Sequence, residues 1–568
     1  MTILEDLNLK KYDIPFILII LIFTAIITIR QIFFNDNAGI YCSDVFIYLI
    51  NSLRCIGIDT GTTDMSLSPV ICYATSLLFK AGYIDEISIY TITGIITIIG
   101  NIGFYILLKK RFTPSLSLLG SILLFSTTLN LLWLATGSID APAISFTIWT
   151  ILFFTLAVDK NPKYYLLALP LFVISFFTRY TAILILPALL IYLLLERNIY
   201  TRVDNFIKNR TINFKKIIKN EKTKYFLFGI ILSGILTLVF LYYIHFFGVK
   251  LNFITTQTAG VNSGFKNVVD SAYTTDTLYY IKYFPSYLFS DKILIKFAAH
   301  PLITNTNILA YIIILITAIG LIWKVINIKT KQIKEEYQTK YLNKTLNILF
   351  IIITLIIIFN FNKLTPSLTV LLTTIDILLI QNLLKKYEIK NLNLHLTILA
   401  WLLINLLIFS QLDIKVNRYI LTIIPAFIYF FLLGLEHIEN KIDINIYKNK
   451  IHLKHIITLI LIITCIFMSA HYIENVELDE KLQSPELISQ YLINYDPNYA
   501  DKEIAAYNKR PYSWFFEMYI WGINDDNMDY LNENDTIDYY IANHEVNNLT
   551  DFQLIKQYGY LHLYARNR

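Results

Sequence analysis

The sequence predicts an α-helical polytopic membrane protein with about 13 transmembrane helices and a small C-terminal extracytoplasmic α/β domain. Of its 568 residues, 55% are hydrophobic and only 16% are charged, whereas soluble proteins carry about a quarter charged residues. Apolar runs of about twenty residues, the length that crosses a bilayer as a helix, recur from Ile14 to Ala470. A soluble multidomain protein is excluded, because its apolar cores would be separated by polar stretches.

The candidate spans follow from length and apolar character, because irregular backbone is not tolerated in contact with lipid. The fifth and sixth are separated only by Thr178-Arg179 and would otherwise form one long helix, which leaves twelve spans as the alternative. The thirteen segments cover residues 14–34, 86–108, 114–133, 140–158, 163–177, 180–195, 225–246, 305–324, 346–361, 366–384, 394–411, 417–435 and 455–471.

Lysine and arginine residues decide the predicted orientation. With thirteen spans and a cytoplasmic N-terminus, most basic residues fall in inner segments, as the positive-inside tendency requires. Twelve spans would turn the basic loops 324–344 and 436–454 outward. We therefore predict a multi-pass cell-membrane protein with an extracytoplasmic C-terminus, whose first span is a retained anchor because no small-residue cleavage site follows it. The basic segments are then topology determinants facing membrane lipids, and nucleic acid is not an expected partner.

Two outer loops and a tail lie outside the predicted spans. The tail alternates short strand-like pieces at 503–506, 538–542 and 558–565 with a helical piece near 485–494. The aromatic second loop suits either an interfacial belt or a substrate lid. The predicted division is a membrane domain, 1–473, with outer loops at about 35–85 and 247–304, and an extracytoplasmic domain, 474–568.

Four cysteines are too few for a disulfide scaffold, and no CxxC or HExxH pattern indicates a metal site. Cys42 and Cys55 share the first outer loop. They either form a disulfide or remain free, depending on whether that loop faces an oxidising space.

Several charged residues gather at the predicted outer ends of the spans. A single charge at a helix end is usually a cap or an interfacial anchor. Acids and arginines on one side together predict an external site, and they are Asp36, Asp44, Asp140, Arg179, Asp413, Lys415 and Arg418. In contrast, Asp376 lies deep within a span and is expected to be a locally paired structural residue.

These residue types suggest sugar transfer from a lipid carrier. Nucleotide donors are not available outside a cell, so a donor there must arrive on a lipid. Transfer from a polyprenyl phosphate needs a carboxylate to accept the proton of the acceptor hydroxyl and a cation to stabilise the departing phosphate. A single displacement inverts the anomeric carbon. A transporter or flippase of lipid-linked saccharides, or an assembly protein that binds a partner through its tail, are the alternatives.

The order of several short motifs resembles the GT-C superfamily of integral-membrane glycosyltransferases, in the family 39-like group of protein mannosyltransferases and aminoarabinose transferases. The resemblance extends over roughly residues 14–435. Its motifs are an acidic residue opening a Tyr-containing amphipathic helix (Asp44–Leu49), Leu67–Val70 ahead of the apolar Leu77–Gly82, Gly137–Pro142 at the start of a span, Thr178–Tyr180 with Pro187, and Arg418-Tyr419 with Pro425.

The resemblance implies a hexosyl- or pentosyltransferase with Asp44 as general base and Asp140 supporting the acceptor side or a metal. Arg179 and Arg418 are the implied phosphate-binding cations, with the neighbouring Tyr180 and Tyr419 as further substrate-binding residues. Many members of the group carry Asp-Glu where this chain has Asp44-Val45. This departure weakens the case for a metal site at the first motif, and Asp36 is a candidate to share the role of Asp44. A divalent metal ion stays an open alternative. The implied partners are a polyprenyl-phosphate sugar and a lipid, protein or polysaccharide acceptor.

Overall fold

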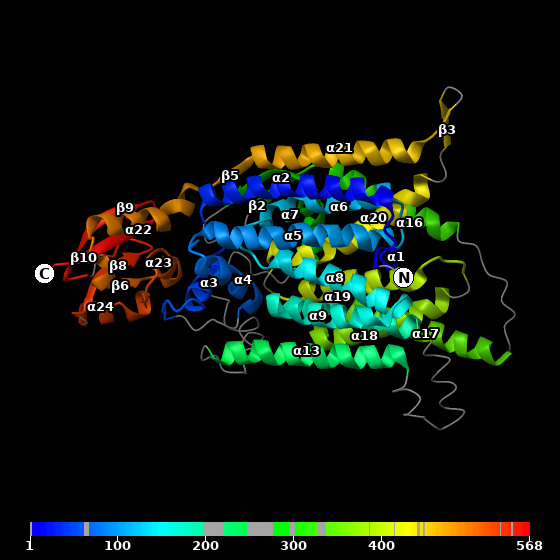
Figure 1. The fold of residues 1–568 in the computed structure, drawn as a ribbon, viewed down its shortest axis with the longest axis horizontal. Coiled ribbons are helices and arrows are strands. Elements are labelled where there is room, and N and C mark those ends of the chain that lie inside the picture. Colours follow the sequence, from blue (N-terminus) through cyan, green and yellow to red (C-terminus); the bar gives the residue numbers. More distant parts are fainter. Residues whose placement is uncertain are drawn as a thin grey trace.

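The structure is a computed structural model. It describes residues 3–61, 67–196, 220–246, 276–295, 302–327, 337–384, 387–413, 415–439, 443–446, 449–533, 535–546 and 549–567. Long helices lie side by side along the molecule, and a small mixed domain caps one end (Figure 1). The N-terminus lies at the other end of the helix bundle. The bundle therefore has a C-terminal-domain end and an N-terminal end.

Ten helices in the described part of the chain are long and apolar enough to cross a membrane, and the chain is a multi-pass membrane protein. Short pieces, α1 (Ile3–Asp6) and η1 (Lys11–Asp13), precede the first. The long helices are α2 (Ile14–Ala38), α5 (Glu86–Lys109), α8 (Asp140–Asp159), α13 (Glu221–Phe246), α16 (Ile308–Ile326), α17 (Tyr337–Asn360), α18 (Pro366–Leu384), α19 (Leu392–Gln411), α20 (Ile424–Glu439) and α21 (Leu453–Glu474).

The other three predicted spans are built from shorter helices. The segment expected at 114–133 is divided into α6 (Pro114–Ser126) and α7 (Thr128–Trp133), because Thr127 takes an extended conformation. The next two are η2 (Pro162–Tyr164) with α9 (Tyr165–Thr178), and η3 (Tyr180–Ile185) with α10 (Leu186–Glu196). Further 3-10 turns, η5 (Phe361–Lys363) and η6 (Asn417–Ile423), precede α18 and α20.

The segments α9 and α10 are two separate helices that run in opposite directions. The backbone of Arg179 is extended, and its side chain forms an ion pair with Asp140, the first residue of α8. Tyr192, near the end of α10, donates a hydrogen bond to Asp159 at the last residue of α8 (2.6 Å). The chain therefore reverses at Arg179 and returns along α8, which is inconsistent with one long helix through both segments.

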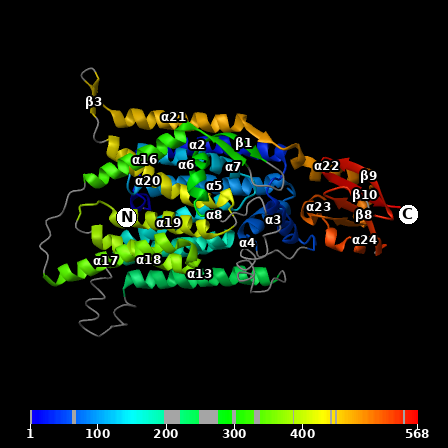
Figure 2. The ribbon, with the colours of Figure 1, turned by 180° about the vertical axis from the view of Figure 1, so that it is seen from behind.

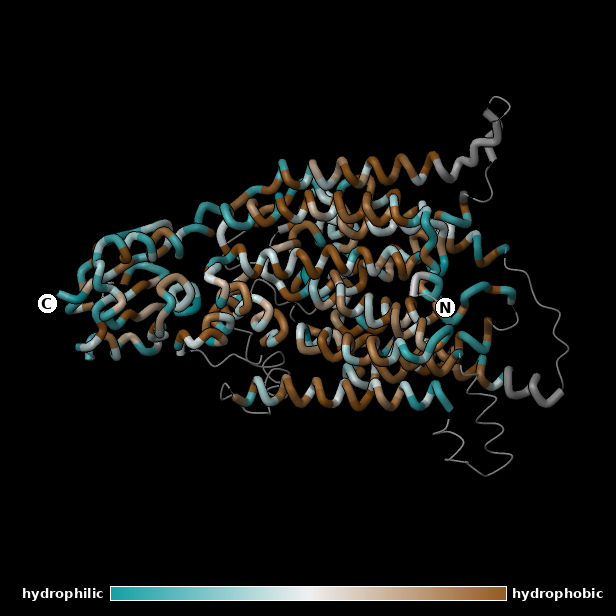
Figure 3. The backbone as a smooth tube through the Cα atoms, viewed as in Figure 1, coloured by the Kyte–Doolittle hydropathy of each residue, from teal (hydrophilic) through white to brown (hydrophobic). Residues whose placement is uncertain are grey.

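The outward surfaces of the bundle are apolar, as contact with lipid requires. Leu238 on α13 is 67% exposed and Phe359 on α17 is 78% exposed. In a soluble protein such large apolar surfaces are rare. Hydrophobic residues predominate along the long helices, and hydrophilic residues are concentrated at the helix ends and in the C-terminal domain (Figure 3).

Smaller elements fill the C-terminal-domain end of the bundle. The helices α3 (Ser43–Arg54) and α4 (Pro69–Lys80) follow α2, and α15 (Tyr279–Leu288) precedes the strand β1 (Ser290–Ile295). In a three-stranded sheet, β1 pairs antiparallel with β2 (Leu302–Thr306) and parallel with β5 (Val476–Leu478). A separate hairpin, β3 (Asp443–Ile446) and β4 (Asn449–His452), precedes α21.

The tail after α21 folds around a five-stranded sheet of order β7-β6-β8-β10-β9. The strand β6 is parallel to β7 and β8, and β10 is antiparallel to β8 and β9. The predicted strands at 503–506 and 538–542 appear as β6 and β8, whereas the expected strand at 558–565 is divided between β9 and β10. The elements are η7 (Glu480–Gln483), α22 (Ser484–Tyr495), η8 (Tyr499–Asp501), β6 (Glu503–Ala506), α23 (Lys509–Phe515), β7 (Trp521–Gly522), η9 (Asp525–Asn527), α24 (Asp529–Glu533), β8 (Ile537–Ala542), β9 (Phe552–Tyr558) and β10 (Leu561–Arg566).

The disulfide alternative does not hold in the structure. Cys42 immediately precedes α3 and Cys55 immediately follows it, and both are free. A helix of this length separates its ends by roughly 18 Å, whereas a disulfide requires Cα atoms within about 7 Å.

Candidate functional site

The first feature of the site is an ion pair between Asp44 and Arg418. Asp44 lies in the first turn of α3, and Arg418 lies in η6, just before α20. Arg418 Nη2 donates to Asp44 Oδ2 at 2.6 Å. The Asp44 side chain is 33% exposed, so the carboxylate is accessible at the C-terminal-domain end of the bundle.

Local packing holds both partners of this pair. All residues of α3 from Val45 to Leu53 are buried, which anchors the helix and presents Asp44 at its N-terminus, where the helix dipole favours negative charge. The Arg418 guanidinium lies over the Trp133 ring at 5.8 Å, and its Nη1 contacts Cys42 Sγ at 3.3 Å. The indole Nε1 of Trp133 donates to Asn417 Oδ1 at 3.2 Å.

A second ion pair joins Asp140 to Arg179. Asp140 opens α8 and is completely buried, and Ser138 Oγ donates to its Oδ2 at 2.9 Å. Arg179 Nη1 contacts the other carboxylate oxygen, and Arg179 Nε donates to Thr181 Oγ1 at 3.0 Å. The guanidinium also lies over the Tyr419 ring at 5.1 Å.

The two ion pairs form one cluster. Tyr419, on which Arg179 stacks, follows Arg418 directly in η6. Asp140 interacts electrostatically with Arg418, and Arg179 with Asp44. The structure therefore brings together Asp44, Asp140, Arg179, Arg418 and Tyr419 from four separate segments.

Burial and charge act in opposite directions on Asp44. Burial raises the pKa of its carboxyl, but the Arg418 guanidinium outweighs this effect and holds the pKa below the ordinary value. Arg510 and Arg179 act in the same direction as Arg418. Asp44 is therefore ionised at neutral pH, whereas burial raises the pKa of the neighbouring Cys42 thiol to about 11 and keeps it protonated.

Two predicted site residues lie elsewhere. Asp36 is exposed in the last turn of α2, and its electrostatic neighbours are Asp85 and Glu486. The Tyr180 ring packs against Phe176, with ring centroids 5.2 Å apart. Adjacency in sequence to Arg179 did not place Tyr180 at the site, because the extended link turns consecutive side chains in different directions.

Sequence analysis missed several residues of the cluster. Trp133 and Cys42 contact Arg418, and Ser138 holds Asp140. Ser138 lies within the Gly137–Pro142 motif, so its position was a usable signal. Nothing in the pattern around Trp133 or Cys42 distinguished either residue from its neighbours.

The Lys415 side chain bonds the backbone at the end of α19. Its ammonium group is buried and donates to the carbonyl oxygen of Ser410 at 2.8 Å, near the end of α19. A cation that bonds the last carbonyls of a helix stabilises its C-terminus.

The described residues do not fit a metal site. No group of three or more His, Cys, Asp or Glu side chains among them is close enough to hold an ion. Asp44 and Asp140 are each paired with a guanidinium instead. We therefore derive no chemical step through a metal.

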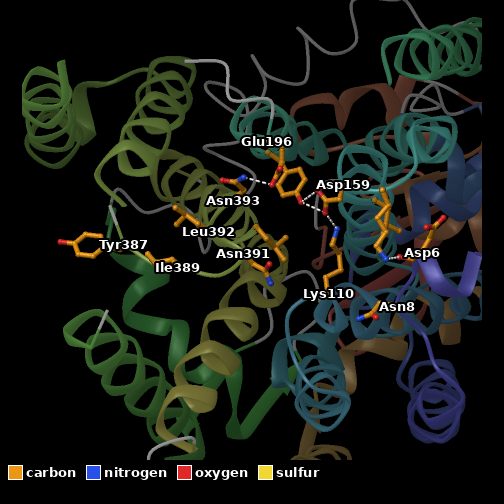
Figure 4. Close-up of a pocket in the computed structure, with 14 residues that line it drawn as sticks. Asp6, Asn8, Lys110, Asp159, Glu196, Tyr387, Ile389, Asn391, Leu392 and Asn393 are labelled. Atoms are coloured by element: carbon orange, nitrogen blue, oxygen red, sulfur yellow. Dashed lines mark hydrogen bonds and ion pairs between the residues drawn. The ribbon is translucent and has the colours of Figure 1, made fainter. Parts of the chain in front are cut away.

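A cavity of about 760 Å³ lies at the opposite, N-terminal end of the bundle. Its polar side chains contact one another: Lys110 pairs with Asp159 at 2.8 Å, and Asn393 donates to Glu196 at 2.7 Å (Figure 4). The 20-residue helix α8 separates Asp159 from Asp140, a rise of about 30 Å. This cavity is therefore separate from the Asp44 cluster.

Comparisons with known proteins agree with this architecture. Residues 66–208, which include Asp140 and Arg179, match the family model described as dolichyl-phosphate-mannose-protein mannosyltransferase. The crystal structure of ArnT from Cupriavidus metallidurans bound to undecaprenyl phosphate is similar with a TM-score of 0.54 and 9% identity, over 96% of this chain and 97% of that chain. The apo structure of the same protein has a TM-score of 0.51 at the same identity and coverage. No curated protein matches the sequence.

These matches confirm the expected resemblance to the GT-C group, in sequence over residues 66–208 and in fold over nearly the whole chain. At 9% identity, the likeness to ArnT establishes the fold and not the residues of the site.

Proposed function

We propose that this protein is a glycosyltransferase that moves a sugar from a polyprenyl-phosphate carrier to an acceptor at the outer face of the membrane. The observation that carries the proposal is the cluster of two carboxylates and two guanidinium groups, Asp44–Arg418 beside Asp140–Arg179. The family match, and the fold shared with a protein whose structure contains undecaprenyl phosphate, support the lipid-linked donor.

Asp44 is the proposed general base. Its carboxylate accepts the proton of the acceptor hydroxyl while the acceptor oxygen forms a bond to the anomeric carbon. The bond from that carbon to the phosphate oxygen breaks, and the leaving phosphate keeps the electron pair. Displacement in a single step inverts the anomeric carbon.

The arginines stabilise the departing phosphate. A guanidinium presents a planar set of donors that matches phosphate oxygens, and Arg418 and Arg179 lie on the same side of the bundle as the base. In the free protein Arg418 bonds Asp44 instead. When a phosphate draws Arg418 away, the pKa of Asp44 rises and the carboxylate becomes a stronger base.

Asp140 acts through Arg179. Its carboxylate is completely buried, so it does not contact a substrate, but it holds the guanidinium against Tyr419. We therefore assign Asp140 and Tyr419 a positioning role. Asp36 and Tyr180 have no part in this scheme, because their side chains lie in other surroundings.

The proposed function requires the Asp44 cluster to face the outer side of the membrane, and this sets the orientation of the protein. The C-terminal-domain end, with residues 474–568, is extracytoplasmic, and the N-terminus of the membrane domain 1–473 is cytoplasmic. Accessibility labelling of single cysteines at each end tests this arrangement.

Replacement of the base tests the proposal. Asp44→Asn in membranes supplied with a polyprenyl-phosphate sugar is expected to lower transfer by about 10²–10⁴-fold, with unchanged expression. The matched control is Glu477→Gln, an exposed carboxylate in β5 paired with the exposed Lys292 at 2.9 Å, and it is expected to transfer sugar as the wild type does. Undiminished transfer by Asp44→Asn would remove Asp44 as the base.

Transport is the competing function. Its only sequence support is Asp376, whose carboxylate accepts a hydrogen bond from Thr354 Oγ1 at 3.1 Å on the neighbouring helix, as expected of a locally paired structural residue. If solute or lipid movement were lost in Asp376→Asn and retained in Asp44→Asn, transport would replace transfer as the function.

A further inference from the structure

The C-terminal domain docks on α3, the helix that carries Asp44, and on the neighbouring helices α4 and α5. Its helix α23 lies between the five-stranded sheet and α3 in both views of the molecule (Figures 1 and 2). Trp514 in α23 donates from Nε1 to Glu86 Oε1 at 2.5 Å and stacks on Phe79, with ring centroids 5.8 Å apart. Its neighbour Phe515 meets Phe46 of α3 edge-on at 5.9 Å.

Two more contacts fix the same domain. Tyr519 fills the space beside Gly61, where an added Cβ would lie 1.9 Å from the tyrosine ring. Gln483 Nε2 donates to the carbonyl oxygen of Asn37 at 2.6 Å. The domain is therefore held against the first loop at several separate points, and α23 has a defined position on α3.

This docking places Arg510 on the face of α23 that meets the bundle. Arg510 and Trp514 are four residues apart in one helix, so their side chains share a face. Phe46, which Phe515 contacts, lies within one turn of Asp44, so α23 meets the end of α3 that carries this carboxylate. Arg510 also contributes to the low pKa of Asp44, which agrees with this placement.

We infer that the C-terminal domain supplies Arg510 as a further cation of the Asp44 site, where it binds the phosphate of the polyprenyl donor. This inference rests on the proposed function. The charges of Arg418 and Arg179 are balanced by Asp44 and Asp140, so a third guanidinium from the C-terminal domain gives the site a net positive charge where the phosphate departs. Its planar donors suit phosphate oxygens better than an ammonium does.

The neighbouring Lys509 provides a matched control. Its ammonium lies over the Tyr519 ring at 5.9 Å, within the C-terminal domain. Lys509 and Arg510 carry the same charge and begin the same helix, but the Lys509 ammonium contacts Tyr519 of its own domain, whereas Arg510 shares the face of Trp514.

The experiment measures binding of undecaprenyl phosphate, without a sugar, to the full-length protein in lipid nanodiscs. Arg510→Gln is expected to weaken binding about tenfold or more, because a hydrogen bond to a charged group is lost. Arg510→Lys is expected to recover part of the loss, since lysine keeps the positive charge but lacks the planar set of donors of the guanidinium. Lys509→Gln is expected to bind as the wild type does, and equal unfolding temperatures show that all variants fold.

A double-mutant comparison separates binding from support of the fold. Trp514→Ala loosens α23, so it is expected to weaken carrier binding in the wild type and to add little in Arg510→Gln, because both changes act on the same cation. Wild-type carrier affinity in Arg510→Gln, with clear loss in Arg418→Gln, would overturn the role of Arg510 and leave the proposed function standing. Absence of both carrier binding and sugar transfer in the wild type would instead overturn the proposed function, and this inference with it.

Discussion

Arg418 donates a hydrogen bond to Asp44 at 2.6 Å, across 374 positions of sequence. The contact joins the start of a short helix after the first span to the turn that precedes α20. It engages the carboxylate in the free protein, and its release by a phosphate is the step on which the proposed chemistry depends.

The pH dependence of transfer reports this contact. Arg418 keeps the pKa of Asp44 below its ordinary value. In the wild-type enzyme without substrate, Asp44 therefore stays ionised as the pH falls to about 4. Removing the cation raises that pKa. Arg418→Gln is therefore expected to show an acidic limb of kcat/KM at higher pH, as well as a lower rate, in a pH–rate profile. An acidic limb that does not move would show that Asp44 is not the titrating base.

The buried pair Asp140–Arg179 predicts a stability effect. Asp140→Asn leaves a nearly buried guanidinium without its charged partner, and breaking such a pair costs about 3–5 kcal/mol. The double variant Asp140→Asn/Arg179→Gln removes both charges and is expected to unfold at a higher temperature than Asp140→Asn. Thermal unfolding in detergent measures both. Equal losses in the single and double variants would contradict coupling between the two residues.

Trp133 is expected to position Arg418 rather than to contribute to the core alone. Trp133→Phe keeps an aromatic face and loses the hydrogen bond to Asn417, which is worth about 1 kcal/mol. We expect a several-fold rise in KM for the donor and a smaller change in kcat. Trp149→Phe, which loses a comparable bond to the carbonyl oxygen of Ile99, is the control and is expected to leave both constants unchanged. Equal effects of the two substitutions would contradict the prediction.

Gly61 is expected to be essential for docking of the C-terminal domain. Both Gly61 and Gly57 have positive φ values, 65° and 98°, so alanine strains the backbone at either position. An added Cβ at Gly61 also clashes with Tyr519, whereas nothing lies within 4 Å of one at Gly57. Gly61→Ala is expected to increase proteolysis of the C-terminal domain and to reduce transfer more than Gly57→Ala does. The paired change Gly61→Ala/Tyr519→Ala relieves the clash and is expected to restore protection in part.

The fold was largely predictable because membrane spans are a local property of the chain. A run of about twenty apolar residues must cross the bilayer wherever it lies in the sequence. The structure has ten such helices in its described part, and shorter helices account for the remaining segments, including the broken pair α6 and α7. The tail also followed its local pattern, since β6 spans the residues expected of it.

The site was predictable only in part. The position of charges at span ends, which follows from the cost of burial in lipid, grouped Asp44, Asp140, Arg179 and Arg418, and these four residues lie together in the structure. The same criterion included Asp36, which lies instead among other acids at the end of α2. The prediction for Tyr180 rests on its proximity in sequence to Arg179, whereas in the structure its ring packs on Phe176.

By itself the sequence determined a polytopic helical bundle, a separate polar tail and the side of the bundle on which the acids and arginines lie. Only the tertiary structure decided that Asp44 pairs with Arg418 and Asp140 with Arg179. It alone kept Cys42 and Cys55 apart across α3 and docked α23 beside Asp44. The physical reason is that spans arise from the composition of neighbouring residues, whereas ion pairs between distant segments depend on how the helices pack together.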